Sequence, residues 1–378
     1  MSARLKVAIR KCPGYAAGLE TILERLLADL GGMGRFVQPG QRVLIKPNLL
    51  TDRTPEQAVT THPEVVRAII RQVKKSGGVP TVADSPASAV RLQQVWEKTG
   101  FRALCEEESI PLLNLEKAGS RSFSVDGCAF NIAQPFLDAD VVINVPKVKT
   151  HSLTVLTGAV KNLYGAVPGY QKTHLHKIYA KPAEFGHMLV GVLKTVRPAL
   201  TIADGIVAMD GAGPAAGRPY PLGILAAAPD PAALDILLCR ILGIDPLRVP
   251  YLRELIEADS ATGAFDRVDV LGDQITDVQA RDFRAPDNLP ARLIPRSLVK
   301  LLGPLIWVRP SLSDSCIKCG RCVEACPKEA LAMQPDSKPV LDPSRCIGCC
   351  CCHEICPVNA IAMEQSPLLR LARGGKTP

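Results

Sequence analysis

Short apolar runs alternate with stretches that carry an apolar residue at every third or fourth position along much of this chain. The runs Leu5–Arg10, Arg42–Lys46 and Val79–Ala83 predict strands, because each is short, apolar and β-prone. Helical spacing over Ala17–Leu30 and Thr61–Lys75 predicts helices between them. Strands that alternate with helices of this length predict an α/β domain, with a mostly parallel open sheet and helices on both faces.

The alternation continues further along the chain. Thr61 is expected to be the N-cap of its helix, with Pro63 in the first turn. The dipeptide Asp126-Gly127 favours a hairpin turn between two short β-prone segments. The remaining predicted elements are helices at Ala89–Thr99 and Pro231–Leu242 and strands at Pro111–Leu115, Val141–Val145, Leu200–Ala203 and Gly223–Ala228.

These patterns divide the chain into four parts. We expect the α/β domain at residues 1–284, a linker rich in Pro and Arg at 285–310, a small cysteine-rich domain at 311–365 and a basic tail at 366–378. The longest apolar run, Leu298–Val308, is too short to span a bilayer and is interrupted by a lysine and a proline. It predicts a linker helix docked on one domain, with weak peripheral membrane contact as the alternative.

Two cysteine arrays dominate the C-terminal part. Each reads Cys-x2-Cys-x2-Cys-x3-Cys-Pro, and the arrays begin at Cys316 and Cys346. Thiolates at this spacing hold three corners of an iron–sulfur cube and take the fourth ligand from the other array. This segment resembles a bacterial two-cluster ferredoxin, which implies a small C-terminal α+β domain. We therefore expect two [4Fe-4S] clusters, one held by Cys316, Cys319, Cys322 and Cys356 and the other by Cys346, Cys349, Cys352 and Cys326.

Two features of the arrays leave alternatives open. Zinc could be held by two Cys-x2-Cys pairs, although a zinc ribbon needs neither the third and fourth cysteines at this spacing nor the prolines. The second array also contains two extra thiols, Cys350 and Cys351. These could be small hydrophobic residues, neighbours that bind no metal, or alternative ligands under oxidation.

Charge and composition narrow the class of partner. The formal net charge of the 378 residues is +8, yet residues 313–366 hold five basic and seven acidic residues, so the excess lies in the rest of the protein. Aromatic residues make up 4% of the chain and no run of five Lys or Arg occurs, which argues against nucleic acid. A basic cleft for a small anionic substrate, or an acidic partner protein, is the better expectation.

Cysteine usage and the N-terminus indicate the compartment. Four scattered cysteines, Cys12, Cys105, Cys128 and Cys239, are interpreted as free thiols, as in a reducing compartment. The N-terminal residues lack the apolar core of a signal peptide and a twin-arginine motif. We therefore expect a cytoplasmic protein.

Polar residues gather directly after the predicted strands, where open α/β sheets bind ligands. Lys147, Lys149 and His151 alternate along an extended segment, so they would share one face and offer two cations and a proton donor. The opposing interpretation is a solvated basic loop. The predicted catalytic residues are Lys147, Lys149, His151, Lys161, Asp204 and Asp210, and the predicted substrate-binding residues are Lys46, Asn48, Asp84, Ser85 and Asn162.

Other residues are weighed against structural roles. Asp84 and Asp204 could equally cap turns, and Asp210 could form a tight turn with Gly211 and Gly213. Asp235 is expected to be a helix-surface charge, and His62 a residue at the start of a helix. His174 and His176 could ligate a metal only with a third ligand that the neighbouring sequence does not supply.

Several of these strings together resemble the family known as domain of unknown function 362. The resemblance spans about residues 5–275, with 147–165 as its specific part, and its members are often fused to a two-cluster ferredoxin domain. A distant similarity to the lactate racemase fold would imply a cleft for small carboxylates. The matching strings are Lys46-Pro47-Asn48, Thr61-His62-Pro63, Asp84-Ser85-Pro86, residues 142–151 and 158–165, Asp204-Gly205, Asp210-Gly211, Gly213-Pro214, Asp230-Pro231 and residues 233–235.

The function expected from these patterns is that of an iron–sulfur oxidoreductase. Electrons from a redox partner protein would pass through two [4Fe-4S] clusters to a small anionic substrate in the basic α/β cleft. One alternative is an electron-transfer protein whose α/β domain docks a partner redox enzyme. Another is a non-redox enzyme with structural clusters, so the sequence leaves enzymatic activity undecided.

Overall fold

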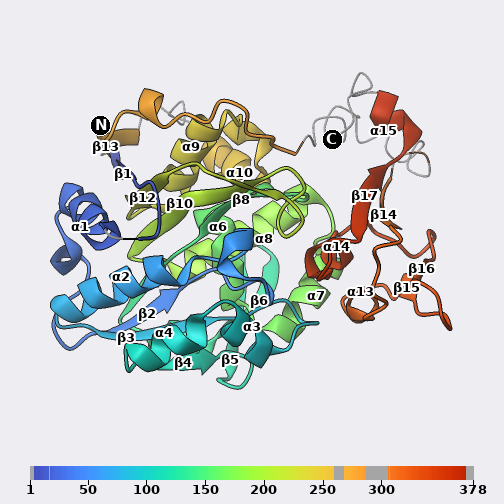
Figure 1. Cartoon of the computed structure of the whole chain (residues 1–378), viewed down its shortest axis with the longest axis horizontal. Coiled ribbons are helices and arrows are strands. Elements are labelled where there is room, and N and C mark those ends of the chain that lie inside the picture. The colour runs from blue at the N-terminus through green and yellow to red at the C-terminus, as the bar shows by residue number, and fades with distance from the viewer. Residues whose placement is uncertain (1–3, 17, 259–267, 287–304, 306, 372–378) are drawn as a thin grey trace.

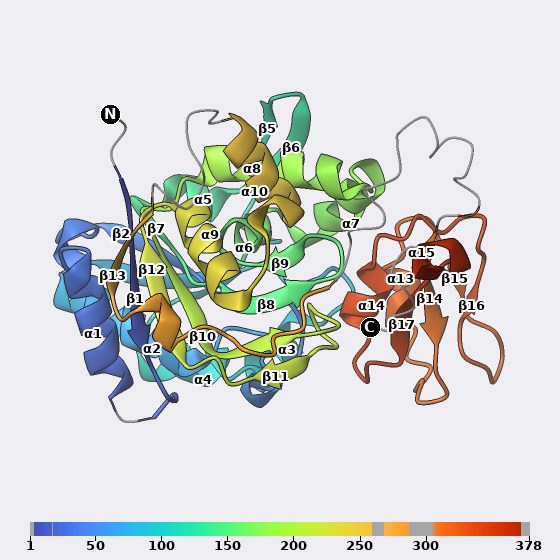
Figure 2. The same ribbon diagram turned by 90° about the horizontal axis from the view of Figure 1, so that it is seen from above.

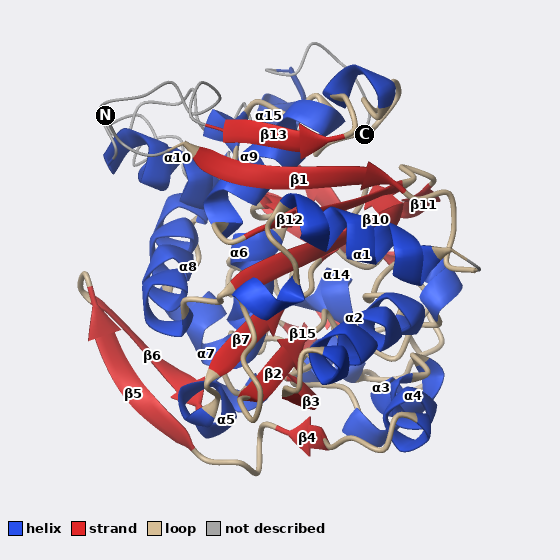
Figure 3. Cartoon of the chain, turned by 90° about the vertical axis from the view of Figure 1, so that its left-hand side faces the viewer, coloured by secondary structure: helices blue, strands red, loops and turns tan. Residues whose placement is uncertain are grey.

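A computed structural model describes residues 4–16, 18–258, 268–286, 305 and 307–371. Within these ranges, eleven strands form one large sheet with helices on both faces (Figures 1 and 3). The α/β fold predicted from the alternation is therefore confirmed. The strands of this sheet are β1 (Leu5–Lys11), β2 (Arg42–Lys46), β3 (Val79–Asp84), β4 (Leu112–Asn114), β7 (Val141–Asn144), β8 (Lys147–His151), β9 (Val155–Thr157), β10 (Leu200–Asp210), β11 (Arg218–Tyr220), β12 (Ile224–Ala228) and β13 (Val268–Gly272).

The strand order is β13-β1-β12-β10-β7-β2-β3-β4, with β8, β9 and β11 attached beside β10. Strands β10, β7, β2, β3 and β4 run parallel to one another, and β1 runs parallel to β13. Strand β12 lies antiparallel between β1 and β10. Because β2, β3 and β7 are parallel neighbours, their carboxyl ends meet at one edge, as open sheets with ligand sites require.

The helices cover the sheet in two layers. Leucines of α1 and valines and isoleucines of α2 pack on one face, while α8, α9 and α10 pack on the other, so each face buries its own core. The hairpin of β5 (Ser120–Val125) and β6 (Cys128–Ala133) forms around Asp126-Gly127 as expected. The helices of this domain are α1 (Leu19–Asp29), α2 (Pro63–Lys75), α3 (Leu92–Lys98), α4 (Phe101–Glu107), α5 (Gln134–Asp138), α6 (Ala159–Asn162), α7 (Gly169–Ile178), α8 (Pro182–Val196), α9 (Pro231–Leu242) and α10 (Pro250–Ala258).

The C-terminal domain lies at one end of the α/β domain, with α14 next to it (Figures 1 and 2). Its small core includes three of the arrayed cysteines and packs against Ala87, Ala89 and Val90 of the α/β domain. Its elements are β14 (Val308–Leu312), α13 (Arg321–Glu324), β15 (Leu331–Ala332), β16 (Val340–Leu341), α14 (Cys351–Ile355), β17 (Ile361–Gln365) and α15 (Pro367–Leu371).

Some predicted boundaries were wrong. Strand β10 continues to Asp210 rather than ending at Ala203, because its second half pairs with β8 and β11. The N-cap of α2 is His62, whose ring accepts a hydrogen bond from Glu64 N. The Thr61 hydroxyl instead donates to Val145 O and accepts from Asn48 N, and so joins two strand ends.

The residues around the expected C-terminal boundaries are only partly described. Most of the linker helix expected over Leu298–Val308 lies outside the described residues, and Val308 itself begins β14. The expected tail begins with α15, and residues 372–378 lie outside the described part.

Asp235 is fully buried in α9, where a surface charge was expected. Its carboxylate accepts hydrogen bonds from Ala159 N (2.6 Å) and Val160 N (3.0 Å), and so satisfies the start of α6. A side chain at Gly158 would collide with this carboxylate, which explains the glycine there. Asp235 therefore fixes α6 against α9.

Replacing Asp235 by alanine should lower the free energy of unfolding by about 2 to 4 kcal/mol, because two buried N–H groups lose their acceptor. Asp235→Asn keeps one carbonyl oxygen and should lose about half as much. Urea unfolding of the three proteins measures both changes. Equal losses in the two variants would contradict this role for the carboxylate.

Candidate functional site

A cavity lies between the α/β domain and the C-terminal domain and contains about 750 Å³ of space not filled by atoms. Its α/β wall comes from the ends of β2, β3 and β8 and from the segment from β9 to α7. Its other wall comes from the C-terminal domain, through Ala325, Cys351, Glu354 and Ile355. Of the predicted site residues, eight line this cavity: Lys46, Asn48, Asp84, Ser85, Lys149, His151, Lys161 and Asn162.

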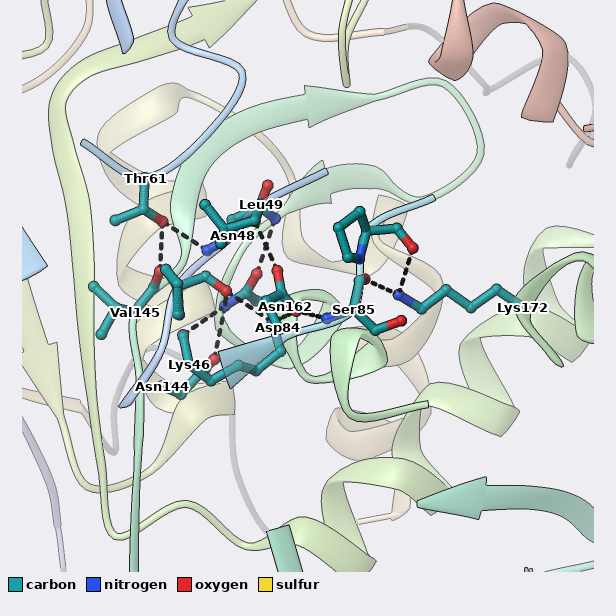
Figure 4. Close-up of polar contacts among 12 residues, drawn as sticks. Lys46, Asn48, Leu49, Thr61, Asp84, Ser85, Asn144, Val145, Asn162 and Lys172 are labelled. Atoms are coloured by element: carbon teal, nitrogen blue, oxygen red, sulfur yellow. Dashed lines mark hydrogen bonds and ion pairs between the residues drawn. The ribbon is translucent and has the colours of Figure 1, made fainter. Parts of the chain in front are cut away.

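A buried ion pair lies at the ends of β2 and β3. Lys46 and Asp84 are 1% and 4% exposed, and their Nζ and Oδ1 atoms are 2.9 Å apart (Figure 4). Leu49 N and Ser85 N also donate to the Asp84 carboxylate. A side chain at Gly165 would collide with both members of the pair, so glycine is required there. The pair is thus satisfied without a ligand.

A chain of amide groups positions the second lysine. Lys149 Nζ donates to Asn48 Oδ1 (3.0 Å), Asn48 Nδ2 to Asn162 Oδ1 (2.9 Å) and Asn162 Nδ2 to Asn144 Oδ1 (2.8 Å). Asn144 Nδ2 ends the chain on Ala159 O. Each asparagine in this chain accepts from the group before it and donates to the group after it, and Figure 4 draws the three asparagines. Lys149 also donates to Val59 O, so all its assigned partners are neutral.

Two further lysines enter the cavity from the segment that follows β9. Lys172 of α7 donates to the carbonyl oxygens of Ser85 and Pro86. Lys161 lies over the rings of Tyr164 (4.9 Å) and Phe185 (5.5 Å), and no carboxylate in the described part of the chain is within ion-pair distance of it. Four lysines therefore face two carboxylates, Asp84 and Glu354.

Burial lowers the pKa of these lysines. Burial, reinforced by the nearby Lys161 charge, lowers the pKa of Lys149 to about 7. Burial likewise lowers the pKa of Lys172 to about 7 and shifts that of Lys161 downward. An anion bound beside these groups would favour their charged form and raise these pKa values again.

Several buried polar atoms along the same cavity have no hydrogen-bond partner within the described residues. They are Ser85 Oγ, His151 Nε2, Thr157 Oγ1, His176 Nδ1 and Glu354 Oε1. His151 Nε2 and Glu354 Oε1 lie 3.2 Å apart but are not oriented for a hydrogen bond. Each unsatisfied buried group costs roughly 1–3 kcal/mol, so a polar ligand at this position would recover free energy.

His151 is oriented by its backbone neighbours. Its Nδ1 accepts from Leu153 N (3.1 Å), which places the ring proton on Nε2, facing the cavity. Burial lowers the pKa of His151, so the neutral ring is favoured. His151 is therefore suited to donating a hydrogen bond, whereas the proton donor predicted from the sequence would need the charged ring.

Three predicted catalytic residues do not line the cavity. Lys147 is fully buried and donates to Asp204 Oδ2 (2.9 Å) and to the Tyr15 hydroxyl (2.8 Å). Asp210 forms a bidentate ion pair with Arg218. Strand β8 pairs with β10 at Lys147–Asp204 and again at Lys149–Met209, with an irregular register between these points, and of the two lysines only Lys149 lines the cavity.

The sequence interpretation missed several cavity residues. Lys172 and His176 lie on α7, a helix that was not predicted, and their spacing of four residues places them on one face. His176 stacks on Phe185 and, in the described residues, belongs to no group of three metal-ligating side chains. Glu354 and Cys351 come from the other domain, and no sequence signal relates them to the α/β strands.

The arrayed cysteines line two smaller cavities of about 320 and 350 Å³. The first cysteine group, Cys316, Cys319, Cys322 and Cys356, lines one of them; the second group, Cys326, Cys346, Cys349 and Cys352, lines the other. Ala330 N donates to Cys326 Sγ and Ala360 N to Cys356 Sγ. Apolar cavities with four thiols and N–H donors aimed at sulfur fit iron–sulfur clusters.

The two arrays repeat one backbone conformation. Lys318 and Gly348 have positive φ, as do Gly320 and Cys350, so Cys350 takes the place of a glycine and Cys351 that of Arg321. Cys350 faces the second group's cavity, whereas Cys351 lines both that cavity and the large one. Cys351 is thus the extra thiol that lies between the two.

Polar contacts join the two domains beside the first cysteine group. Arg321 of α13 forms a bidentate pair with Asp52, which also meets Lys98. Arg53 donates to Cys356 O and to Asn359 Oδ1, both at 2.6 Å. The buried Asp52 carboxyl keeps a pKa of about 2, because the bonds from Arg321 and Lys98 outweigh the effect of burial.

The fold and the cysteine groups define an α/β protein with a fused ferredoxin-type domain. The family described as Domain of unknown function (DUF362) matches residues 43–240, and the family described as 4Fe-4S dicluster domain matches residues 315–360. The chain therefore belongs to the DUF362 family and carries an iron–sulfur domain. No helix in the described part of the chain has both the length and the apolar character needed to cross a membrane.

Two known proteins are similar to parts of this chain. The thylakoid-associated protein sll1697 of Synechocystis sp. is 44% identical over 251 residues, which cover 65% of this chain and 77% of that protein. The lactate racemase apoprotein of Thermoanaerobacterium thermosaccharolyticum aligns with a TM-score of 0.40 and 14% identity, over 64% of this chain and 57% of its own.

The cavity lysines predict how anion affinity depends on pH. Sulfate remains a dianion across neutral pH, whereas Lys149 and Lys172, with pKa values of about 7, lose their charge as the pH rises above 7. Sulfate binding above pH 7 must therefore be coupled to proton uptake by these two lysines. Affinity should be highest below pH 7 and fall by up to about tenfold per pH unit for each lysine as the pH rises. Calorimetry in buffers of different ionisation enthalpy measures this uptake, and Lys149→Gln should remove part of it. An affinity that is constant from about pH 6 to pH 9 would contradict this coupling.

Proposed function

We propose that this protein is an iron–sulfur oxidoreductase that reduces a small dianionic substrate in the cavity between its two domains. The observation that carries the proposal is that Cys351 lines both the lysine cavity and the cavity of the second cysteine group. A substrate in the lysine cavity would lie one side chain away from a cluster, a distance suited to electron transfer.

The charges in the cavity support a dianion. With their ammonium groups charged, four lysines exceed the two carboxylates by two positive charges. The unpartnered Ser85, Thr157 and His151 groups can donate hydrogen bonds to carboxylate or phosphate oxygens. A dicarboxylate and a phosphate monoester share this chemistry, so both classes are candidates.

A two-electron reduction of a carbonyl or alkene group in such a substrate consumes two electrons and two protons. Two clusters, each holding one electron from an external one-electron carrier protein, would supply the electrons. Lys149 and Lys172, with pKa values of about 7, are suited to donate the two protons at neutral pH. His151 would orient the substrate through Nε2, and solvent would reprotonate the lysines.

The carrier protein would dock at the first cysteine group. Cys319 is exposed there, and Ile317 and Val358, which line the same cavity, are 59% and 38% exposed. Electrons would then pass from the first group to the second and on to the substrate. A cytoplasmic location fits the buried free thiols of the α/β domain. The name of the Synechocystis relative describes that protein as thylakoid-associated.

The crossed ligation of two [4Fe-4S] clusters has a direct test. The anaerobically purified protein should contain about eight iron atoms, and Cys316→Ser/Cys319→Ser should keep about four. In that variant, adding Cys326→Ser should disrupt the remaining cluster, whereas adding Cys356→Ser should leave its EPR spectrum unchanged. The reverse result, or zinc in place of iron, would refute the ligand assignment.

The reductase activity is tested by oxidation of prereduced clusters. Unsaturated or oxo dicarboxylates and phosphorylated aldehydes are added to the dithionite-reduced protein, freed of excess dithionite, and cluster absorbance is followed. Lys161→Gln should slow the reaction by about tenfold or more, since a charged hydrogen bond to substrate is lost. Lys177→Gln, on the exposed side of α7, should have no effect. If no compound reacts while a carrier protein exchanges electrons rapidly, the electron-transfer alternative is favoured instead.

A further inference from the structure

The lysine cavity and the cavity of the second cysteine group share a wall. Cys351 lines both, and the short helix α14 continues from Cys352, of the second group, to Glu354, which faces the lysines. The cavity of the first group shares no lining residue with the lysine cavity. Charges in the lysine cavity therefore adjoin the second group directly through Cys351, whereas the link to the first group runs through Ile355, which lines the lysine cavity and is bonded to Cys356.

Solvent screens these charges weakly. Lys149 and His151 are 1% exposed, Thr157 is 3% exposed and Lys161 is partly buried against aromatic rings. In such surroundings a charge acts over a longer distance than in water. A cluster gains one negative charge on reduction, so nearby cations stabilise its reduced state and nearby anions oppose it.

We infer that a dianion bound in the lysine cavity lowers the midpoint potential of the cluster held by the second cysteine group, and lowers it more than that of the first group. This inference rests on the proposed function, because it takes the substrate cavity and the clusters as given. Its consequence is regulatory, because the reduced cluster becomes a stronger reductant when a substrate-like anion is bound. By linkage, reduction of that cluster weakens anion binding by the same factor.

Arg53 provides an internal reference for the other cluster. It donates to the carbonyl of Cys356 in the first group, and the equivalent carbonyl of Cys326 has no arginine partner in the described contacts. Removing this cation in Arg53→Gln should lower the first cluster's potential. The variant therefore identifies which of two EPR-monitored transitions belongs to which group.

The experiment is a redox titration of the holoprotein at about pH 6, with sodium sulfate or with sodium chloride of equal ionic strength. At this pH the lysines already carry their charge, so sulfate binding is not offset by proton uptake. Sulfate should lower one midpoint by about 59 mV, which is a tenfold change for a one-electron couple. The midpoint that sulfate lowers more should be the one that does not change in Arg53→Gln.

Reciprocal binding and a matched pair of variants complete the test. Equilibrium dialysis should show about tenfold weaker sulfate binding to the reduced protein, as the reciprocal of the potential shift. Lys161→Gln should diminish the shift and Lys161→Arg should retain it. Sulfate that binds without moving either midpoint, or that moves both equally, would overturn the inference and leave the proposed function intact. Absence of sulfate binding at pH 6 would instead refute the cavity on which the proposed function depends.

Discussion

Four lysine side chains, two buried and two partly buried, lie beside two carboxylates, and this is the constraint on which the rest of the structure depends. Removing a charge from water costs several kcal/mol unless partners replace the lost solvation. The partners that replace water differ from one lysine to the next. Asp84 pairs with Lys46, and Lys149 donates to the first of a chain of asparagine amides. Lys161 receives aromatic rings in place of a carboxylate. The ends of β2 and β3 supply the paired charges, and glycine at position 165 leaves room for them.

The same constraint explains why the two domains act as one unit. Residues of the C-terminal domain form one wall of the lysine cavity, and Glu354 supplies one of its two carboxylates. Arg53 and Asp52 of the α/β domain in turn reach across to the neighbourhood of the first cysteine group. Each domain therefore completes the electrostatic environment of the other.

Local patterns in the sequence predicted the parts of this structure that local interactions determine. Apolar runs identified β1, β2, β3 and β7, and cysteine spacing identified the ferredoxin-type domain. Strand-end positions identified eight cavity residues. The alternation of Lys147 and Lys149 could not reveal that only Lys149 lines the cavity, because the pairing of Lys147 with Asp204 and Tyr15 is a tertiary contact.

The residues that were missed depend on tertiary contacts. Asp235 was expected on a helix surface, yet its partners are backbone groups more than seventy residues away in the chain. Glu354 and Cys351 approach the lysines only because the C-terminal domain docks at that edge of the sheet. Periodicity carries no information about such docking.

The repeated cysteine arrays give the C-terminal domain two nearly equivalent halves, in which Arg321 and Cys351 occupy matching positions. Both positions face the α/β domain: Arg321 meets Asp52, and Cys351 meets the lysine cavity. If the domain docked after exchange of its halves, an arginine would enter a cavity already rich in cations, and Asp52 would be buried against a thiol. Electrostatics thus favours the observed docking over one with the halves exchanged, and it places the second cysteine group beside the lysine cavity.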